Sequence, residues 1–130
     1  MLTQIAYVTI LVRDQDEALG FYTEKLGMEK REEDTSIPGA RWLTVAPKGQ
    51  EGVAFVLRKA EGEELDRVGK QTGGEFFCIL LTDNCRKAYG TLQSRGVRFL
   101  KPPEELPFGV VATFEDLYGN LLDLWEPRQA

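Results

Sequence analysis

A β-branched apolar run followed by a helical pattern opens the chain. Residues 8–12 (VTILV) are apolar and short enough for a buried strand. Asp14, with Glu17 three positions later, is typical of a helix N-cap and its capping-box partner. Apolar residues at helical spacing follow, and Gly27 stands where many helices end in the left-handed conformation. The pattern predicts a strand, a helix and a glycine stop in direct succession.

The same order of polar and apolar positions returns in the second half of the chain. Residues 76–81 (FFCILL) form another apolar run, and Asp83 or Asn84 can cap the helical pattern that follows it. Gly96 ends this pattern at the same spacing from Asp83 as in the first half. An internal repeat at half the chain length limits the possible folds more tightly than any single residue does.

Three more predicted strands complete each half, and the first of them has a charged outer face. Pro102, Pro103 and Pro107 predict an irregular, stiff crossing in the second half, and residues 116–120 (DLYGN) predict a tight turn. Each half then follows the order β-α-β-β-β, which makes an α+β protein. The additional strands are predicted at residues 28–33, 42–45 and 53–57, and at residues 97–100, 110–115 and 121–125.

We expect residues 1–130 to form a single domain built from two modules. The modules are predicted at about residues 4–60 and 75–127, because the repeated pattern has these limits. Residues 61–74 begin with the acidic run EGEELDRV and continue with a glycine-rich stretch. Such a composition is typical of a short helix or loop that acts as a solvated connector between modules.

Composition narrows the possible partners and compartments. The chain has 130 residues, of which 42% are hydrophobic, so it can bury a core. Its net charge of −5 argues against nucleic acid or an anionic membrane as a partner. Two cysteines, no basic leader and no apolar stretch of bilayer length indicate a cytoplasmic protein. The chain contains no histidine.

Two segments carry a resemblance to a known family. The stretch VTILVRDQDEALGFYTEKLGM, the closing FEDLYGNLLDLWEP and the repeated modules resemble the vicinal oxygen chelate superfamily. This group includes glyoxalase I, bleomycin-resistance proteins, fosfomycin-resistance enzymes and extradiol dioxygenases. The resemblance implies two tandem βαβββ modules forming a curved, cup-shaped mixed sheet, and a homodimer. The family's usual Asp-Pro-Asp-Gly-Asn turn is altered in its centre, while its Asp116, Gly119 and Asn120 remain.

The resemblance also implies four metal-ligand positions, which this chain does not keep. The family places a histidine on the first strand of each module and an acid on the last. Those positions fall on Tyr7, on Phe77 (or Phe76 if the register slips by one), on Phe55 and on Asp123. Aromatic rings supply no strong donor to a divalent cation. We therefore expect a metal-independent protein with no cofactor.

Strand alternation predicts what lines the cup, because residues two apart share a sheet face. Trp42 is expected at the mouth of the pocket or in a dimer contact. Val8, Ile10, Cys78, Leu80, Leu122 and Leu124 are expected to pack behind, against the helices. The expected ligand-binding face consists of Tyr7, Thr9, Leu11, Phe55, Leu57, Phe77, Ile79, Asp123 and Trp125.

Two functional classes fit this lining. The first is a glyoxalase/bleomycin-resistance-like protein that binds a small apolar or aromatic molecule without transforming it. The second is an enzyme, such as a lyase, isomerase or dioxygenase-like protein, that uses Asp123 and Tyr7 as acid and base or holds a metal elsewhere. Tyr7 is the expected hydrogen-bond donor to Asp123. The alternative for these residues is purely structural, with the rings filling the interior and Asp123 held by Tyr7 or by backbone amides.

Overall fold

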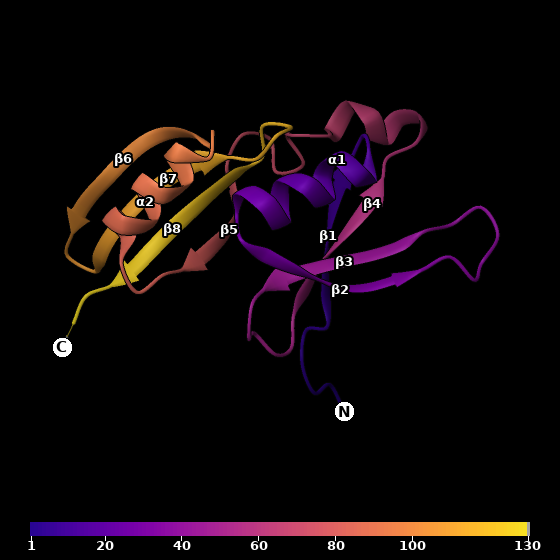
Figure 1. The fold of residues 1–130 in the computed structure, drawn as a ribbon, viewed down its shortest axis with the longest axis horizontal. Coiled ribbons are helices and arrows are strands. Elements are labelled where there is room, and N and C mark those ends of the chain that lie inside the picture. The colour runs from indigo at the N-terminus through magenta and orange to yellow at the C-terminus, as the bar shows by residue number, and fades with distance from the viewer. Residues whose placement is uncertain (130) are drawn as a thin grey trace. The chain divides into compact units, whose positions relative to one another are not determined.

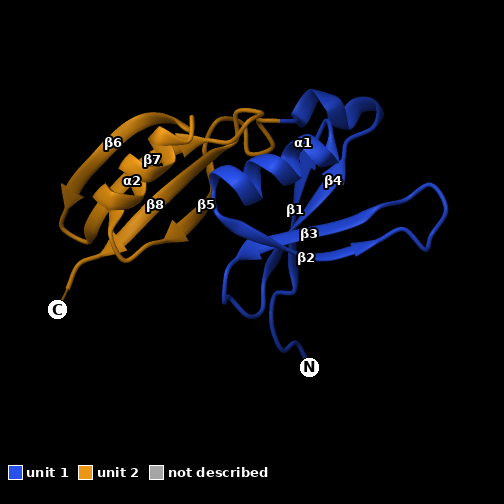
Figure 2. Cartoon of the chain, viewed as in Figure 1, with its two compact units in different colours: residues 1–68 blue, residues 69–130 orange. Residues whose placement is uncertain are grey.

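The computed structural model describes residues 1–129 and divides into two compact units. The first unit comprises residues 1–68 and the second begins at Gly69 (Figure 2). Each unit contains a four-stranded mixed sheet and helices, and the two have the same topology. The repeated pattern of the sequence therefore corresponds to a repeated structure.

Unit 1 folds as one mixed sheet with a helical segment. Its strands lie in the order β1-β4-β3-β2, and β1 is parallel to β4 while the other neighbours are antiparallel. In Figure 1, β2 and β3 cross β1 and β4 and extend as a long hairpin, as expected of a strongly twisted sheet. The elements are β1 (Tyr7–Val12), α1 (Gln15–Gly20), η1 (Phe21–Lys25), β2 (Met28–Asp34), β3 (Trp42–Pro47), β4 (Ala54–Lys59) and η2 (Gly62–Arg67).

The predicted cap and stop determine the limits of the first helical segment. The backbone N–H of Glu17 donates to Asp14 Oδ1 at 2.8 Å, which satisfies one of the free amides at the start of α1. The segment continues into a wider π-helical turn, η1, and ends before Gly27, whose φ is 77°. Glycine adopts this left-handed conformation without a steric cost.

Aromatic and aliphatic side chains form the core of unit 1 between the helix and one sheet face. Tyr22 is fully buried, and its ring lies 6.1 Å from that of Phe55 on β4 in an edge-to-face arrangement. Ile10 and Leu57 lie side by side on β1 and β4, and both are fully buried. Burial of such side chains contributes about 1.5–3 kcal/mol each to folding.

Unit 2 repeats this plan. Its strands lie in the order β5-β8-β7-β6, with β5 parallel to β8. The Asn84 side chain caps the helix by accepting from the N–H of Lys87 at 3.0 Å, so Asn84 is the cap and Asp83 is not. The elements are β5 (Phe76–Leu81), α2 (Cys85–Ser94), β6 (Arg98–Leu106), β7 (Gly109–Glu115) and β8 (Leu121–Pro127).

The prediction of an irregular crossing through the prolines of unit 2 is wrong. Strand β6 continues past Pro102 and Pro103 to Leu106, and its pairing with β7 shifts register on either side of Lys101. β6 lies at the edge of the sheet. An edge strand tolerates proline because its outward N–H groups have no strand partner. The register shifts accommodate the hydrogen bonds that proline cannot donate to the neighbouring strand.

The acidic run after β4 forms a short 3-10 helix, η2, that belongs to unit 1. Glu61 and Glu64 form a reciprocal capping box, and Glu64 also forms an ion pair with Arg58 of β4. Val68, which follows η2, is buried. The segment expected to be a solvated connector is thus partly packed against its own sheet.

None of the helices in residues 1–129 is both long and apolar enough to cross a membrane.

The turn before β8 is held by a buried carboxylate. Asp116 is 3% exposed, and its Oδ1 accepts from the N–H groups of Tyr118 and Asn120, both at 2.9 Å. Its Oδ2 accepts from Asn120 Nδ2 at 2.9 Å, and Gly119 takes a φ of 104°. The polar residues of this turn therefore fix its shape, and Tyr118 contributes its backbone N–H to these bonds, not its side chain.

Candidate functional site

The strand register defines the face of the unit 1 sheet that lies away from the helix, called the open face here. Tyr7, Thr9 and Leu11 of β1 lie beside Ala54, Val56 and Arg58 of β4, and Thr44 of β3 lies beside Val56. Directly paired residues share a face, so these side chains belong to one surface. The hairpin adds Glu32 beside Thr44, and Asp34 beside Trp42.

The expectation that Phe55 and Leu57 share the open face is wrong. They pair with Val8 and Ile10 of β1, so they belong to the face that packs against the helix. Phe55 is 8% exposed and contacts the ring of Tyr22, and Leu57 is fully buried. The open-face positions on β4 are one residue away, at Val56 and Arg58.

Tyr7, Trp42 and Glu32 form the main cluster of the unit 1 open face. The Tyr7 hydroxyl donates to Glu32 Oε1 at 2.7 Å, and Trp42 Nε1 lies 3.3 Å from the same oxygen. The rings of Tyr7 and Trp42 meet edge to face with centroids 5.0 Å apart. Thr44 is fully buried and completes the cluster, since its Oγ1 accepts from the N–H of Glu32 at 3.0 Å and lies 3.4 Å from Glu32 Oε1.

These contacts shift the pKa of both titratable groups in opposite directions. The hydrogen bond from Tyr7, followed by that from Trp42, lowers the pKa of Glu32, because donors favour the ionised carboxylate. The hydrogen bond to Glu32 in turn raises the pKa of Tyr7. At neutral pH the cluster therefore contains a carboxylate and a neutral phenol.

A cleft of about 1280 Å³ lies along the β2–β3 hairpin. Trp42, Glu32, Val56 and Arg58 are among the residues that line it, and Ile37 lies near the hairpin tip with 70% of its surface exposed. The volume is ample for a small organic molecule, whose pockets usually measure about 300–1,000 Å³.

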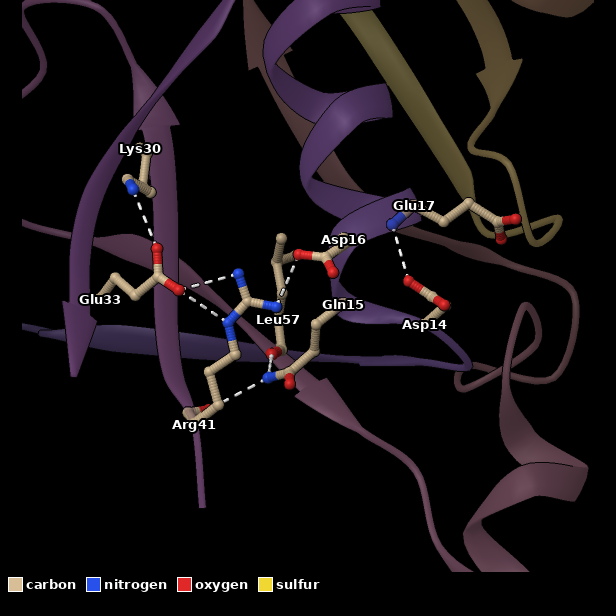
Figure 3. Close-up of polar contacts among 8 residues, drawn as sticks. All are labelled: Asp14, Gln15, Asp16, Glu17, Lys30, Glu33, Arg41 and Leu57. Carbon is tan, nitrogen blue, oxygen red and sulfur yellow. Dashed lines mark hydrogen bonds and ion pairs between the residues drawn. The ribbon is translucent and has the colours of Figure 1, made fainter. Parts of the chain in front are cut away.

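Arg41 fixes the base of the hairpin against α1 (Figure 3). Its guanidinium forms ion pairs with Asp16 and Glu33, both at 2.8 Å, and Glu33 also pairs with Lys30 at 2.9 Å. Gln15 donates to the carbonyl oxygens of Arg41 at 3.0 Å and Leu57 at 2.8 Å. Strand β3 is thereby held at the start of α1.

The open face of unit 2 carries the other expected residues. Ile79 of β5 lies beside Asp123 of β8, and Asp123 lies beside Thr113 of β7, so these three share a face. Trp125 of β8 is two residues from Asp123 and therefore shares it. The expected placement of Ile79, Asp123 and Trp125 agrees with this register, as does that of Leu122 and Leu124 in the core.

The neighbours of Asp123 and the position of Phe77 differ from expectation. Asp123 Oδ1 accepts from the Thr113 hydroxyl at 2.7 Å, and Tyr7 donates to Glu32, so each of the two side chains bonds a residue of its own unit. A register shift between Phe76 and Cys78 gives the open-face position beside Leu121 to Phe76. Phe77 itself is half-buried.

The donors at the implied metal-ligand positions do not fit a divalent cation. The implied positions carry Tyr7, Phe55, Phe77 (or Phe76) and Asp123, and only the last is a carboxylate. Within residues 1–129 no group of three or more His, Cys, Asp or Glu side chains is arranged to hold a metal ion. The residues at these positions therefore offer a metal ion too few donors.

The two cysteines are unreactive in this environment. Burial raises the pKa of Cys78 to about 11. Burial and the nearby Glu126 carboxylate raise the pKa of Cys85. A thiol with a raised pKa contains little thiolate at neutral pH and is a poor nucleophile.

Comparison with protein families agrees with the fold and the repeat. A sequence model of the Glyoxalase/Bleomycin resistance protein/Dioxygenase superfamily matches residues 4–124. The chain belongs to this superfamily. An uncharacterized protein of Shewanella frigidimarina is 40% identical over 126 residues, covering 95% of this chain and 93% of that protein.

Solved structures of the superfamily extend this comparison. UcmS2 is 40% identical with a TM-score of 0.86, covering 97% of this chain and 99% of its own. TnmS3, described as an antibiotic binding protein from Streptomyces sp. CB03234, is 29% identical with a TM-score of 0.83, covering 98% of both chains. The likeness extends over both units.

Glu32, Thr44 and Thr113 were not identified from the sequence. The pattern of residues 28–33 predicts only a strand with a charged outer face. A signal existed, because a hairpin that turns at Pro38-Gly39 can pair Glu32 with Thr44 and so place both beside Trp42. Alternation within single strands could not reveal it, since it says nothing about which strands are neighbours.

Proposed function

We propose that this protein binds a small planar, apolar or aromatic molecule on its open sheet faces and does not transform it. The observation that carries the proposal is the pair of half-exposed rings, Tyr7 and Trp42, meeting edge to face beside a cleft large enough for such a ligand. Exposed aromatic faces in a concave surface gain free energy by stacking on a flat ligand. The similarity to TnmS3, an antibiotic binding protein, is consistent with this kind of function.

The groups available for catalysis support binding over reaction. The sequence contains no histidine, and both thiols have raised pKa values. The pKa of Tyr7 is raised and that of Glu32 is lowered, which makes the phenol a poorer acid and the carboxylate a poorer base. The alternative, an enzyme in which Tyr7 and Asp123 act together, is disfavoured because each bonds a residue of its own unit instead.

We propose that the protein binds its ligand as a homodimer in the cytoplasm. Strand β5 lies at the edge of its sheet, and Phe76, Ile79 and Leu81 on it are 48%, 51% and 72% exposed. An exposed apolar edge strand is a liability in an isolated chain. A second copy covering this strand would remove the liability.

Tryptophan fluorescence tests the proposed function directly. The chain has two tryptophans, Trp42 and Trp125, and both lie on open faces. A library of planar aromatic molecules is first screened by thermal shift, because binding to the folded state raises Tm by mass action. We expect a ligand from this screen to quench the fluorescence saturably, with one molecule per site.

Two single variants assign the site. Trp42→Phe should remove most of the quenching if the ligand binds in unit 1, and Trp125→Phe should remove it if the ligand binds in unit 2. Asp123→Asn should weaken binding only in the second case, by about 1.5–3 kcal/mol for a lost charge-assisted bond. Ligands that raise Tm but leave both tryptophans unquenched would place binding away from the open faces and refute the proposal.

A further inference from the structure

The cleft in unit 1 contains negative charge that its own cations do not neutralise. Each of its three arginines is paired with a carboxylate that does not line the cleft, and Arg41 also pairs with Glu33 of the lining, which Lys30 outside the cleft pairs as well. None of the ion pairs among residues 1–129 involves Glu32. Asp34 accepts neutral hydrogen bonds from Ser36, and Lys59 and Glu61 add one charge of each sign to the lining. The arginine pairs are Arg31 with Glu29, Arg41 with Asp16 and Arg58 with Glu64.

Glu32 is held in place by neutral donors that leave its charge intact. The three side-chain bonds to its carboxylate, from Tyr7, Trp42 and Thr44, all end at Oε1. They orient the carboxylate and keep it ionised, but a hydroxyl or indole N–H carries no compensating positive charge. None of these three bonds uses Oε2, and Glu32 is one of the residues that line the cleft.

The ring beside this carboxylate is suited to a positively charged π-system. Trp42 lies in the cleft lining with 39% of its surface exposed, and the Tyr7 ring supports it from the side at 5.0 Å. A cation over an indole face gains about 0.5–1 kcal/mol at an exposed site and more when water is excluded. A carboxylate next to such a ring adds a charge-assisted hydrogen bond for any N–H of the same cation.

We propose that the unit 1 cleft selects planar aromatic ligands that carry a protonated nitrogen, with Trp42 as the stacking surface and Glu32 Oε2 as the acceptor of a charged N–H. The inference rests on the proposed function, which requires only that a small planar molecule binds. It adds the charge of that molecule and the residue that recognises it.

Three acridines of nearly equal size test the charge preference at pH 7. 9-Aminoacridine is a cation at this pH, acridine is neutral, and acridine-9-carboxylate is an anion. Each is titrated into the wild-type protein by fluorescence and calorimetry. We expect 9-aminoacridine to bind about tenfold more tightly than acridine, as one charge-assisted bond supplies, and the carboxylate to bind most weakly because Glu32 repels it.

Glu32→Gln isolates the proposed residue, since glutamine keeps an acceptor oxygen for Tyr7 and Thr44 but loses the charge. The cation preference should fall to within about twofold in this variant. Glu24→Gln, an equal change of charge on an exposed residue of η1 outside the cleft, should keep the full preference.

The two proposals fail in distinguishable ways. Equal affinity for the three acridines, or a cation preference that survives in Glu32→Gln, overturns the charge proposal and leaves small-molecule binding intact. Absence of 9-aminoacridine binding at millimolar concentration, while a neutral planar ligand still quenches Trp42, overturns it as well. Absence of quenching by every planar molecule tested overturns the proposed function itself.

Discussion

At the scale of single residues, the carboxylate of Glu32 gives the open face of unit 1 its polarity. Tyr7 and Trp42 meet at this one oxygen from strands β1 and β3, while Glu32 lies on β2. The three residues thus connect three strands through side chains alone. A ligand on this face would touch two rings and a carboxylate without any movement of the backbone.

Removing the Tyr7 hydroxyl should raise the pKa of Glu32. Tyr7→Phe deletes the largest cause of the lowered Glu32 pKa, so the value should move up toward that of an ordinary glutamate. A lowered pKa in the folded state stabilises the protein above the unfolded-state pKa, and this contribution disappears as the pH falls through the folded-state pKa. The difference in unfolding free energy between wild type and variant should therefore shrink on acidification.

NMR titration of the Glu32 side-chain carboxyl carbon measures this effect. Tyr89→Phe serves as the control, because Tyr89 packs on Phe99 in unit 2 and lies in the other unit from Glu32. An unchanged Glu32 pKa in Tyr7→Phe would mean that the bond between the two side chains is not populated in solution.

The alternation of residues along each strand placed most open-face residues correctly and Phe55, Leu57 and Phe77 wrongly, and the reason lies in strand pairing. Alternation along β8 was sufficient for Asp123 and Trp125, because the buried Leu122 and Leu124 alternate with them. In β4 every residue from Ala54 to Leu57 is buried, so no alternation of polar and apolar residues marks the two faces. The face of Phe55 depends on its parallel pairing with Val8, and such long-range register is not encoded within one strand.

At the scale of elements, caps and turns were the most predictable features. Asp14, Gly27 and Gly119 all have the local conformations that their side chains favour, since these depend on neighbours a few residues away. The prediction from the prolines of β6 was wrong because their effect is not local. Their effect depends on whether the strand lies at an edge, which only the assembled sheet decides.

The turn before β8 should depend strongly on Asp116. Asp116→Ala removes the acceptor of three hydrogen bonds and leaves buried donors of Asn120 unsatisfied, so it should lower the free energy of unfolding by about 2–4 kcal/mol. Urea denaturation followed by circular dichroism measures the change. Asp66→Ala, on an exposed residue of η2, should stay within about 0.5 kcal/mol of wild type. Equal effects of the two substitutions would show that the Asp116 bonds do not stabilise the turn.

At the scale of the whole molecule, the repeat determines the architecture of the two units, and the proposed function depends on their open faces. Both units place one helical segment on one face of a four-stranded mixed sheet and leave the other face to a small cluster of aromatic and polar side chains. The α+β fold followed from the repeat in the sequence, whose family is now established over residues 4–124. The identity of the ligand could not be predicted from the sequence, because a cluster of rings and one carboxylate restricts the shape and charge of a ligand without specifying a compound.

The assembled protein is expected to be a dimer. Sedimentation velocity at micromolar concentration should give the mass of two chains, with two-fold symmetry as the usual arrangement. Leu81→Asp places a charge on the most exposed apolar residue of β5 and should shift the mass toward one chain. Phe108→Asp, the same kind of change on an exposed residue between β6 and β7, should leave the dimer intact. A wild-type protein that sediments as a single chain would contradict the dimer.

The most direct test of the central claim, binding without transformation, is the chemical recovery of a bound ligand. The protein is saturated with the ligand found by tryptophan quenching, incubated for a day, denatured, and the released small molecule is quantified by chromatography and mass spectrometry. Binding without reaction predicts one ligand recovered per occupied site, with its mass and retention time unchanged. A product of altered mass that forms in the wild-type protein and not in Tyr7→Phe or Asp123→Asn would contradict the account and identify an enzyme.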